Sequence, residues 1–343
     1  FTDPTHRVVG AKMKNQAVKY YPMLPVLAAY AVLFLIGRNM SGMWQLGAML
    51  LFYCALGQAF NIFLGMTGYV DFGYVAFMGV GTYGMALAIS RLAHIEGLGA
   101  GIIVIGFVLA VLMSTLLSIA VGAVALRLRG AYFAIATIGV NEGFRFLIEG
   151  ARIWNGSEGI IFTAQLNQIL GREAASALAI FWADVFVLTI AVAAALVTLI
   201  YMRSKIGYAL TALREDEDAA KVMGINVTKF KIIAFITSAS FAGLVGASSW
   251  ALKTPYVFPP EVFEIHYTIE AIIIVLLGGA GTLLGPLVGG LIYGISKYYL
   301  SIFIPGFQLL IFAPIIIVII VVFPEGVVGM LKAKTRNTAV GRF

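Results

Sequence analysis

One hydrophilic segment interrupts a chain that is otherwise strongly apolar. Residues 203–231 separate two long apolar runs and carry a short stretch of acids and alanines that ends at a glycine: Glu215, Asp216, Glu217, Asp218, Ala219, Ala220 and Gly224. A charged side chain at the centre of a bilayer costs several kcal/mol, so this segment must lie outside the hydrocarbon. Its short helical core and the closing glycine predict an ordered docking element.

The remainder of the chain has the composition of a membrane protein. Its 343 residues are 61% hydrophobic and 11% charged, whereas soluble domains carry about 25% charged residues. Because a helical span needs roughly 20 apolar residues, we predict an all-α polytopic integral membrane protein with about ten transmembrane helices. The apolar runs lie near 21–37, 43–63, 72–90, 100–126, 131–149, 178–202, 232–252, 266–279, 283–300 and 307–323.

Two of these runs are short and meet at glycines. The runs 266–279 and 283–300 flank a break that contains the glycines Gly278, Gly279, Gly281 and Gly285. Irregular backbone at membrane depth is tolerated only where it is buried in protein or lines a cavity. We therefore predict two short, broken helices, with the glycines serving close packing or a hinge.

Clustered basic residues predict the orientation. Most lysines and arginines fall in the first 20 residues, at 127–129, in 203–231 and after 331. With ten spans all four clusters lie on one side, which is the cytoplasm by the positive-inside rule. We predict a cytoplasmic tail at 1–20, one transmembrane domain at 21–330 with a cytoplasmic loop at 203–231, and a cytoplasmic tail at 331–343. These loops account for the net charge of +7 without nucleic acid as a partner.

Polar residues inside the apolar runs are candidates for a translocation pathway. Intramembrane charges are functional by default and usually face an aqueous path, although Glu142, Arg145 and Glu149 stand at helical spacing and can also pair structurally. Between residues 65 and 84, glycines alternate with polar and aromatic residues, a pattern that also suits a translocation pathway. The predicted pathway residues are Asn61, Thr67, Tyr69, Asp71, Tyr74, Tyr132, Thr137 and Glu142.

Several functional classes lack their sequence signatures. The chain has no Gly-x-x-x-x-Gly-Lys-Ser/Thr loop for nucleotide phosphates and no visible catalytic Ser/His/Asp set. Its three histidines are far apart and show no metal-ligand spacing. We therefore predict that the chain is not itself an enzyme and holds no metal or cofactor.

Five segments in order carry a family resemblance. The segments 61–81, 126–139, 212–224 with 231–235, 275–282 and 323–326 resemble the permease subunits of bacterial and archaeal branched-chain amino-acid ABC importers of the LivM type. The likeness runs from about residue 45 to 331. One run departs from it, because residues 154–160 read Trp-Asn-Gly-Ser-Glu-Gly-Ile where many members have Thr-Gly-Gly-Pro-Asn-Gly-Ile. Urea, amides and other small polar solutes, which related permeases carry, thus stay open as alternatives to amino acids.

The resemblance implies a permease subunit of an ATP-driven importer in a bacterial or archaeal inner membrane. It implies a second permease of the LivH type that completes a pathway for branched-chain or other small amino acids. It also implies two ATPase subunits that bind ATP and Mg, and an extracytoplasmic binding protein. The segment 203–231 would hold the coupling helix, whose exposed charges meet an ATPase through Arg214 and the residues Glu215 to Ala220, with Gly224 as a left-handed stop.

Two other functions compete with this interpretation. The membrane charges Asp71, Glu142 and Arg145 suggest an ion-coupled secondary transporter, a class that often shows paired repeats with broken helices. Glycine breaks occur in both halves of the chain, at 65–68 and 278–281, but no internal sequence match accompanies them. A membrane anchor or receptor for soluble partners is the third possibility.

Overall fold

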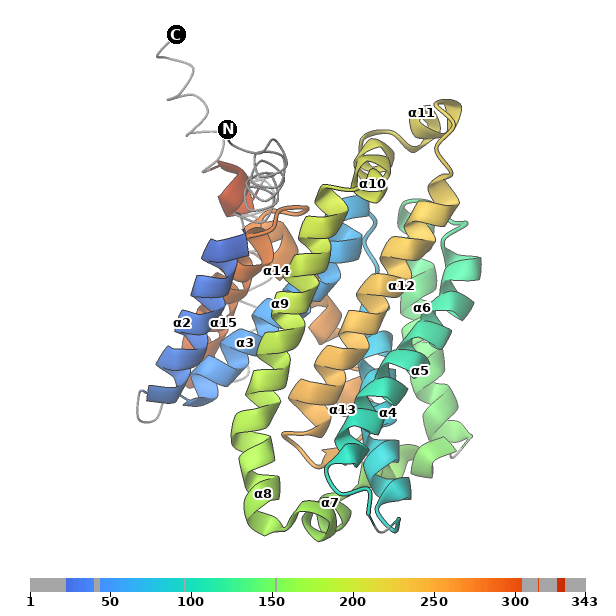
Figure 1. Cartoon of the computed structure of the whole chain (residues 1–343). Helices are drawn as coiled ribbons and strands as arrows, with labels where there is room; N and C mark the ends of the chain where they lie inside the picture. Colours follow the sequence, from blue (N-terminus) through green and yellow to red (C-terminus); the bar gives the residue numbers. More distant parts are fainter. Residues whose placement is uncertain are drawn as a thin grey trace, which may run out of the picture.

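The computed structural model describes residues 23–39, 44–95, 97–151, 153–303, 314 and 326–330, and most of them are helical (Figure 1). Within these ranges the strands are β1 (Ile160–Ile161) and β2 (Tyr256–Val257), which pair antiparallel with Ile160 opposite Val257. The predicted all-α class is therefore confirmed. The predicted tails at 1–20 and 331–343 lie outside the described residues, and so does the predicted span 307–323 apart from residue 314.

Long helices build the bundle and short ones connect them. The long elements are α2 (Met23–Asn39), α3 (Trp44–Phe60) with the π-helical turn η1 (Asn61–Gly65), α4 (Tyr74–Leu92), α5 (Gly101–Ala125), α6 (Ala131–Gly150), α9 (Ala183–Met202), α12 (Val227–Gly246) with η4 (Ala247–Ala251), α14 (His266–Gly278) and α15 (Gly285–Phe303). The short elements are η2 (Ile153–Glu158), α7 (Thr163–Leu170), α8 (Arg172–Ala177), η3 (Leu178–Trp182), α10 (Lys205–Glu215), α11 (Glu217–Val222) and α13 (Pro259–Val262).

Several of these helices can cross a membrane. By length and composition, five continuous helices in the described ranges qualify, namely Trp44–Gly65, Tyr74–Leu92, Gly101–Ala125, Arg172–Met202 and Val227–Ala251. Met23–Leu35 is a shorter apolar helix. The helix α6 carries three charged residues, and α14 is only 13 residues long. A polytopic membrane protein is thus supported, while the count of ten spans stays a prediction.

The connections gather at two opposite ends of the bundle (Figure 1). The short helices α10 and α11 lie at one end, together with the turn between α5 and α6 and the break between α14 and α15; α7 and α8 lie at the other. Hydrogen bonds from Arg129 to Asp218 and from Arg214 to Ala280 tie the first group together. The basic clusters at 127–129 and 203–231 therefore share one end, as predicted. That this end faces the cytoplasm stays a prediction.

Glycines set the closest helix contacts. A Cβ atom added at Gly81 on α4 would lie 2.2 Å from the Gly243 Cα on α12, so these helices meet backbone to backbone. A Cβ added at Gly278 would lie 1.8 Å from the carbonyl oxygen of Gly285, which holds α14 against α15. Small residues permit this approach where lipid offers no hydrophobic drive for association. Close packing therefore accounts for many of the glycines that the sequence singled out.

Candidate functional site

The hydrophilic segment folds as two short helices joined at Asp216. This residue has an extended backbone with φ −155°, which ends α10, and its Oδ1 accepts hydrogen bonds from the amides of Asp218 (2.9 Å) and Ala219 (3.0 Å) to cap α11. Asp is a preferred residue at this capping position. Gly224 follows α11 with φ +82°, a left-handed conformation that glycine adopts without steric cost. The acidic run therefore encodes a cap between two helices, and the predicted glycine stop is confirmed.

The carboxylate of Glu217 is the centre of a polar cluster that we call the Glu217 hub. Its Oε2 accepts hydrogen bonds from Lys231 Nζ at 2.7 Å and from the Tyr69 hydroxyl. Its Oε1 lies 2.9 Å from Lys221 Nζ and 3.4 Å from Arg129 Nε. The Lys231 ammonium also sits 3.9 Å from the centre of the Tyr69 ring, in a cation–π contact. The hub thus joins α11 to α12, to the loop before α4 and to the α5–α6 turn.

Electrostatics keep the Glu217 hub ionised. Burial alone would raise the pKa of Glu217, but hydrogen bonds from Lys231, Tyr69 and Lys221 outweigh it and lower the pKa to about 2. Burial and the neighbouring carboxylate raise the pKa of Tyr69, so its hydroxyl keeps its proton and donates. The Lys231 side chain is only 2% exposed and depends on Glu217 as its counter-charge. Glu217 is therefore bonded to the bundle, and a contact of the four acids with an ATPase stays a prediction.

The outward surface of α10 and α11 combines acids with large apolar side chains. Asp218 has a side chain that is 71% exposed, and Glu215 is exposed beside it. Val222 and Met223 are 87% and 81% exposed at the end of α11, and Tyr208 on α10 is 73% exposed. Exposed apolar groups rimmed by polar residues mark interaction sites. Sequence reasoning missed the three apolar residues, although their place beside the acids was a usable signal.

Arg214 points toward the bundle and not away from it. Its Nη1 donates to the carbonyl oxygens of Gly65 (2.8 Å) and Ala280 (3.3 Å). The first carbonyl ends η1, and the second belongs to the α14–α15 break. Arg214 therefore connects the hydrophilic segment to two irregular places in the membrane bundle.

Most of the predicted pathway residues are enclosed in the bundle. Five of them are at most 2% exposed, and their polar groups bond to nearby backbone: Asn61 to Gly281 and Thr282, Thr67 to Phe63, Asp71 to Gly73, Tyr74 to Ser238 and Thr137 to Phe72 and Ala134. A sixth, Tyr69, belongs to the Glu217 hub. Tyr69 also lines an open hollow of about 410 Å³ with Phe72 and Ala134.

The other two predicted pathway residues lie on an open helix. Tyr132 on α6 is 75% exposed, and the Glu142 side chain is 33% exposed. Arg145 pairs with Glu142 at 3.3 Å and with Glu149 at 3.4 Å, as the helical spacing predicted. The same helix exposes a stripe that we call the α6 face, formed by Tyr132, Ile135, Gly139, Gly143, Phe146 and Gly150. A Cβ atom added at any of its three glycines would meet nothing within 4 Å.

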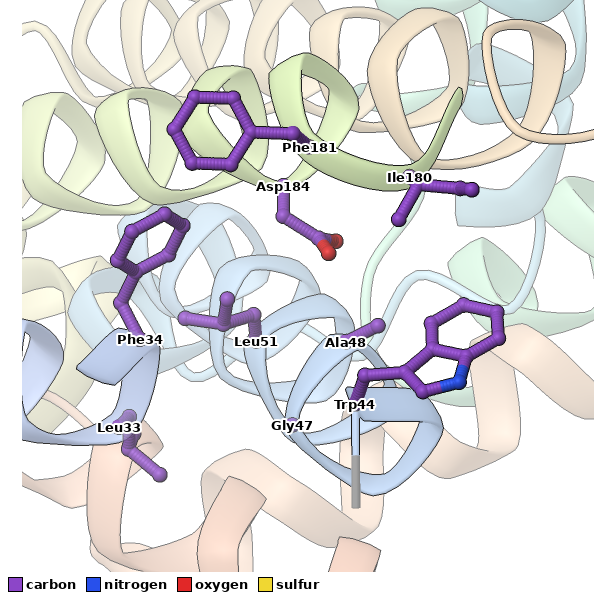
Figure 2. Close-up of a pocket in the computed structure, with 9 residues that line it drawn as sticks. All are labelled: Leu33, Phe34, Trp44, Gly47, Ala48, Leu51, Ile180, Phe181 and Asp184. Carbon is purple, nitrogen blue, oxygen red and sulfur yellow. The ribbon is translucent and has the colours of Figure 1, made fainter. Parts of the chain in front are cut away.

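Hollows near the opposite end are small or open. One cavity of about 60 Å³ lies between α2, α3 and η3, where Asp184 points among aromatic side chains that include Phe34, Trp44 and Phe181 (Figure 2). Asp184 also forms an ion pair with Lys253, which lines a groove of about 290 Å³ with Trp250, Tyr267 and others. A space of 60 Å³ holds only water-sized occupants. The sequence placed Asp184 at the outer rim; in the structure it lies in the first turn of α9, shortly after α8, and α8 lies at the end opposite α11 (Figure 1).

Comparison with known proteins assigns the family. The family described as branched-chain amino acid transport system / permease component matches residues 42–320. The chain belongs to this family. The predicted resemblance is thereby confirmed.

Individual relatives come from bacteria and archaea. The permease protein LivM of the high-affinity branched-chain amino acid transport system of Salmonella typhimurium is 28% identical over 93% of this chain and 76% of its own length. LivH of the corresponding Escherichia coli system is 23% identical over 81% of this chain and 91% of its own. A probable LivM of Methanocaldococcus jannaschii is 24% identical over 72% of this chain and 73% of its own. No solved structure matches the chain.

The permease therefore carries its most organised polar cluster on the connections between its membrane helices. Sequence reasoning listed Glu217 and Tyr69 in two separate sets, one for coupling and one for the pathway, whereas the structure joins them through a hydrogen bond. Lys231 was counted only as a basic loop residue. Its position 14 residues after Glu217 gave no signal, because the contact depends on the turn at Gly224 that brings α12 back beside α11.

Proposed function

We propose that the chain is the transmembrane permease subunit of an ATP-driven importer for branched-chain amino acids. Membership of the permease family supports this function. The observation that carries it is the ordered polar element α10–α11, which projects from an apolar bundle and is fixed to it by the Glu217 hub. A passive anchor in the membrane has no need of such a rigid connection.

Two ATPase subunits, which hold ATP and Mg, are the proposed partners of α10–α11. The exposed side chains of Val222 and Met223 suit an apolar hollow on an ATPase, and Glu215 and Asp218 suit basic or polar groups at its rim. This end of the bundle would then face the cytoplasm of a bacterium or archaeon, with both chain termini on that side. An extracytoplasmic binding protein would deliver the solute to the opposite end.

A second permease of the LivH type is the proposed partner of the α6 face. Exposing a charged side chain to lipid costs free energy. The side chains of the Glu142–Arg145–Glu149 cluster are nevertheless 19–33% exposed beside this face, which favours a protein partner there. The open glycines Gly139 and Gly143 permit a neighbouring helix to approach closely. A pathway that runs between the two permeases would place Tyr132 and Glu142 at its wall.

The proposed mechanism transmits ATPase movement through α11. When the ATPases close on ATP they displace α11, and the Glu217 hub passes this displacement to α12, to the loop before α4 and to the α5–α6 turn. A partner shifts a conformational balance only by contacting the two states differently. The inward-open and outward-open states must therefore differ in how α11 meets the ATPases.

Reconstitution of the whole complex tests the function. The chain is co-expressed with the products of its neighbouring genes, purified and placed in liposomes, and uptake of radiolabelled leucine is measured with and without ATP. We expect uptake that requires ATP and the binding protein and that persists when ionophores collapse ion gradients. Uptake of urea in place of leucine would favour the alternative solute. Uptake that follows an ion gradient without ATPases would contradict the proposal and support a secondary transporter.

A further inference from the structure

Two irregular segments of the bundle touch each other beneath α10. The turn η1 ends at Gly65, and the break between α14 and α15 passes directly beside it. A Cβ atom added at Gly65 would lie 2.5 Å from the Gly281 amide nitrogen, and one added at Gly281 would lie 2.6 Å from the Gly65 carbonyl oxygen. These backbones are therefore in direct contact, and no side chain fits between them.

Asn61 locks the two segments together from inside the bundle. Its Oδ1 accepts a hydrogen bond from the Gly281 amide at 2.9 Å, and its Nδ2 donates to the Thr282 carbonyl at 3.0 Å. The break is also closed on itself, because the Thr282 hydroxyl donates to the Gly279 carbonyl and accepts from the Gly285 amide. The break is thus a bonded turn that hydrogen bonds attach to the end of α3.

Arg214 binds the same two segments from the side of α10. Its guanidinium donates to the carbonyls of Gly65 and Ala280, one from each segment. Both carbonyls follow helical turns, where backbone dipoles present partial negative charge to a cation. The stem of Arg214 rests on Gly68, where an added Cβ would lie 3.2 Å from its Cγ. Since Gly68 has φ +75°, glycine is favoured there on both backbone and steric grounds.

We propose that Arg214 is a positioning residue that couples movement of α10 and α11 to the joined ends of α3 and of the α14–α15 hairpin. The inference rests on the proposed function, because it assumes that partners move α11. The helix α10 packs on α9, α11 and α12, so its bond to Ala280 extends its reach to α14 and α15. The Glu217 hub and Arg214 then act on different helices. The hub connects α11 to α4, α6 and α12, and Arg214 connects α10 to α3, α14 and α15.

Arg214 is exposed, so direct contact with an ATPase is the alternative that the variants must separate from this role. Arg214 donates both of its hydrogen bonds inward, to carbonyls of the membrane bundle. A guanidinium presents a planar set of donors that can hold two acceptors at once, whereas a lysine ammonium acts as a compact point charge. Replacement by lysine therefore keeps the charge that a partner would feel but loses the bridge between the two carbonyls.

The test uses the complete complex in nanodiscs with leucine-loaded binding protein. ATPase activity is measured without and with the binding protein for the wild type, Arg214→Gln and Arg214→Lys. Loss of a charge-assisted hydrogen bond is worth enough to change an equilibrium about tenfold, so we expect the ratio of stimulated to unstimulated ATPase to fall about tenfold in Arg214→Gln. Arg214→Lys should show a similar fall, because lysine keeps the charge but loses the bridge between the two carbonyls. The matched control is Lys205→Gln, an exposed change at the start of α10, which should leave the ratio unchanged.

The outcomes separate this inference from the proposed function. A wild-type complex that shows no ATP-dependent uptake contradicts the function itself. A working wild type whose Arg214→Gln variant keeps the full ratio, or whose stimulated and unstimulated rates fall in parallel, overturns the positioning role and leaves the function intact. If Arg214→Gln does not assemble, Arg214→Lys decides the question by the same ratio.

Discussion

Replacing Glu217 by glutamine removes one charge from the centre of the hub while it preserves the size of the side chain. Three cations surround this carboxylate, and one of them, Lys231, is almost fully buried. The Glu217→Gln variant leaves that ammonium without its counter-charge. Removing one partner of a buried ion pair destabilises a protein more than replacing both partners by apolar residues, because it leaves the other charge buried and uncompensated. We therefore expect loss of stability and not only loss of coupling.

The size of the effect follows from the pKa of Glu217. A pKa shift from 4.5 to about 2 corresponds to a contribution of about 3 kcal/mol to the free energy of unfolding before solvent screening is considered. Solvent screens part of this, because the side chains of Arg129 and Lys221 are 50% and 41% exposed, and exposed pairs contribute at most about 1 kcal/mol each. We expect a net loss of roughly 2 kcal/mol, most of it from Lys231. For domains of 150–250 residues, each kcal/mol lowers Tm by about 2–4 °C, so Tm should fall by several degrees.

Thermal melting of the purified chain in detergent measures this loss, and a double variant tests its cause. If the unpaired Lys231 is responsible, Glu217→Gln combined with Lys231→Met should melt above Glu217→Gln alone, because no buried charge remains. The matched control is Asp218→Asn, whose side chain is 71% exposed and whose loss should change Tm very little. An unchanged Tm in Glu217→Gln, or an equal loss in Asp218→Asn, would refute the reasoning.

Three further predictions use the same melting assay. Because the folded pKa of Glu217 is depressed, the stabilisation that its charge provides is complete above pH 4.5 and is lost as pH falls toward about 2. The difference in Tm between wild type and Glu217→Gln should therefore be constant near neutral pH and shrink in acid. A constant difference at every pH would contradict this assignment. Gly81→Ala places a methyl 2.2 Å from Gly243 and should cost about 1–3 kcal/mol, whereas Gly139→Ala, with open space around it, should be harmless to the single chain. Gly224→Ala, at φ +82°, should cost about 1 kcal/mol, and Gly224→Asn less.

Local signals in the sequence predicted local structure well. The acids before Ala219 and the later Gly224 indicated a short helix with a left-handed stop, and the structure has both features; the cap by Asp216 was not predicted. Capping and backbone conformation depend on neighbours within a few residues, so they can be seen in the sequence. The α14–α15 break was predictable for the same reason, since its glycines stand together in the sequence.

Contacts between distant segments could not be predicted. Tyr69 lies 148 residues from Glu217, and Asn61 lies 220 residues from Gly281, so no spacing rule connects them. Polar residues inside apolar runs were predicted to line a pathway, but Asn61, Tyr74 and others satisfy backbone groups where helices end or cross. Lipid offers no hydrogen-bond partners, so polar groups at membrane depth need partners within the protein. A buried residue that bonds to backbone and a residue that lines a pathway therefore look alike in the sequence.

The hydrophilic segment divides its charges between two tasks, and this division constrains how it can work. A charge that contacts a partner must be exposed, and Glu215 and Asp218 are exposed. A charge that transmits movement must be bonded to the bundle, as Glu217 and Arg214 are. Because the two kinds alternate within five residues, a short rigid element can hold a partner on one side and the bundle on the other. A long flexible loop with the same composition would dissipate any displacement before it reached the membrane helices.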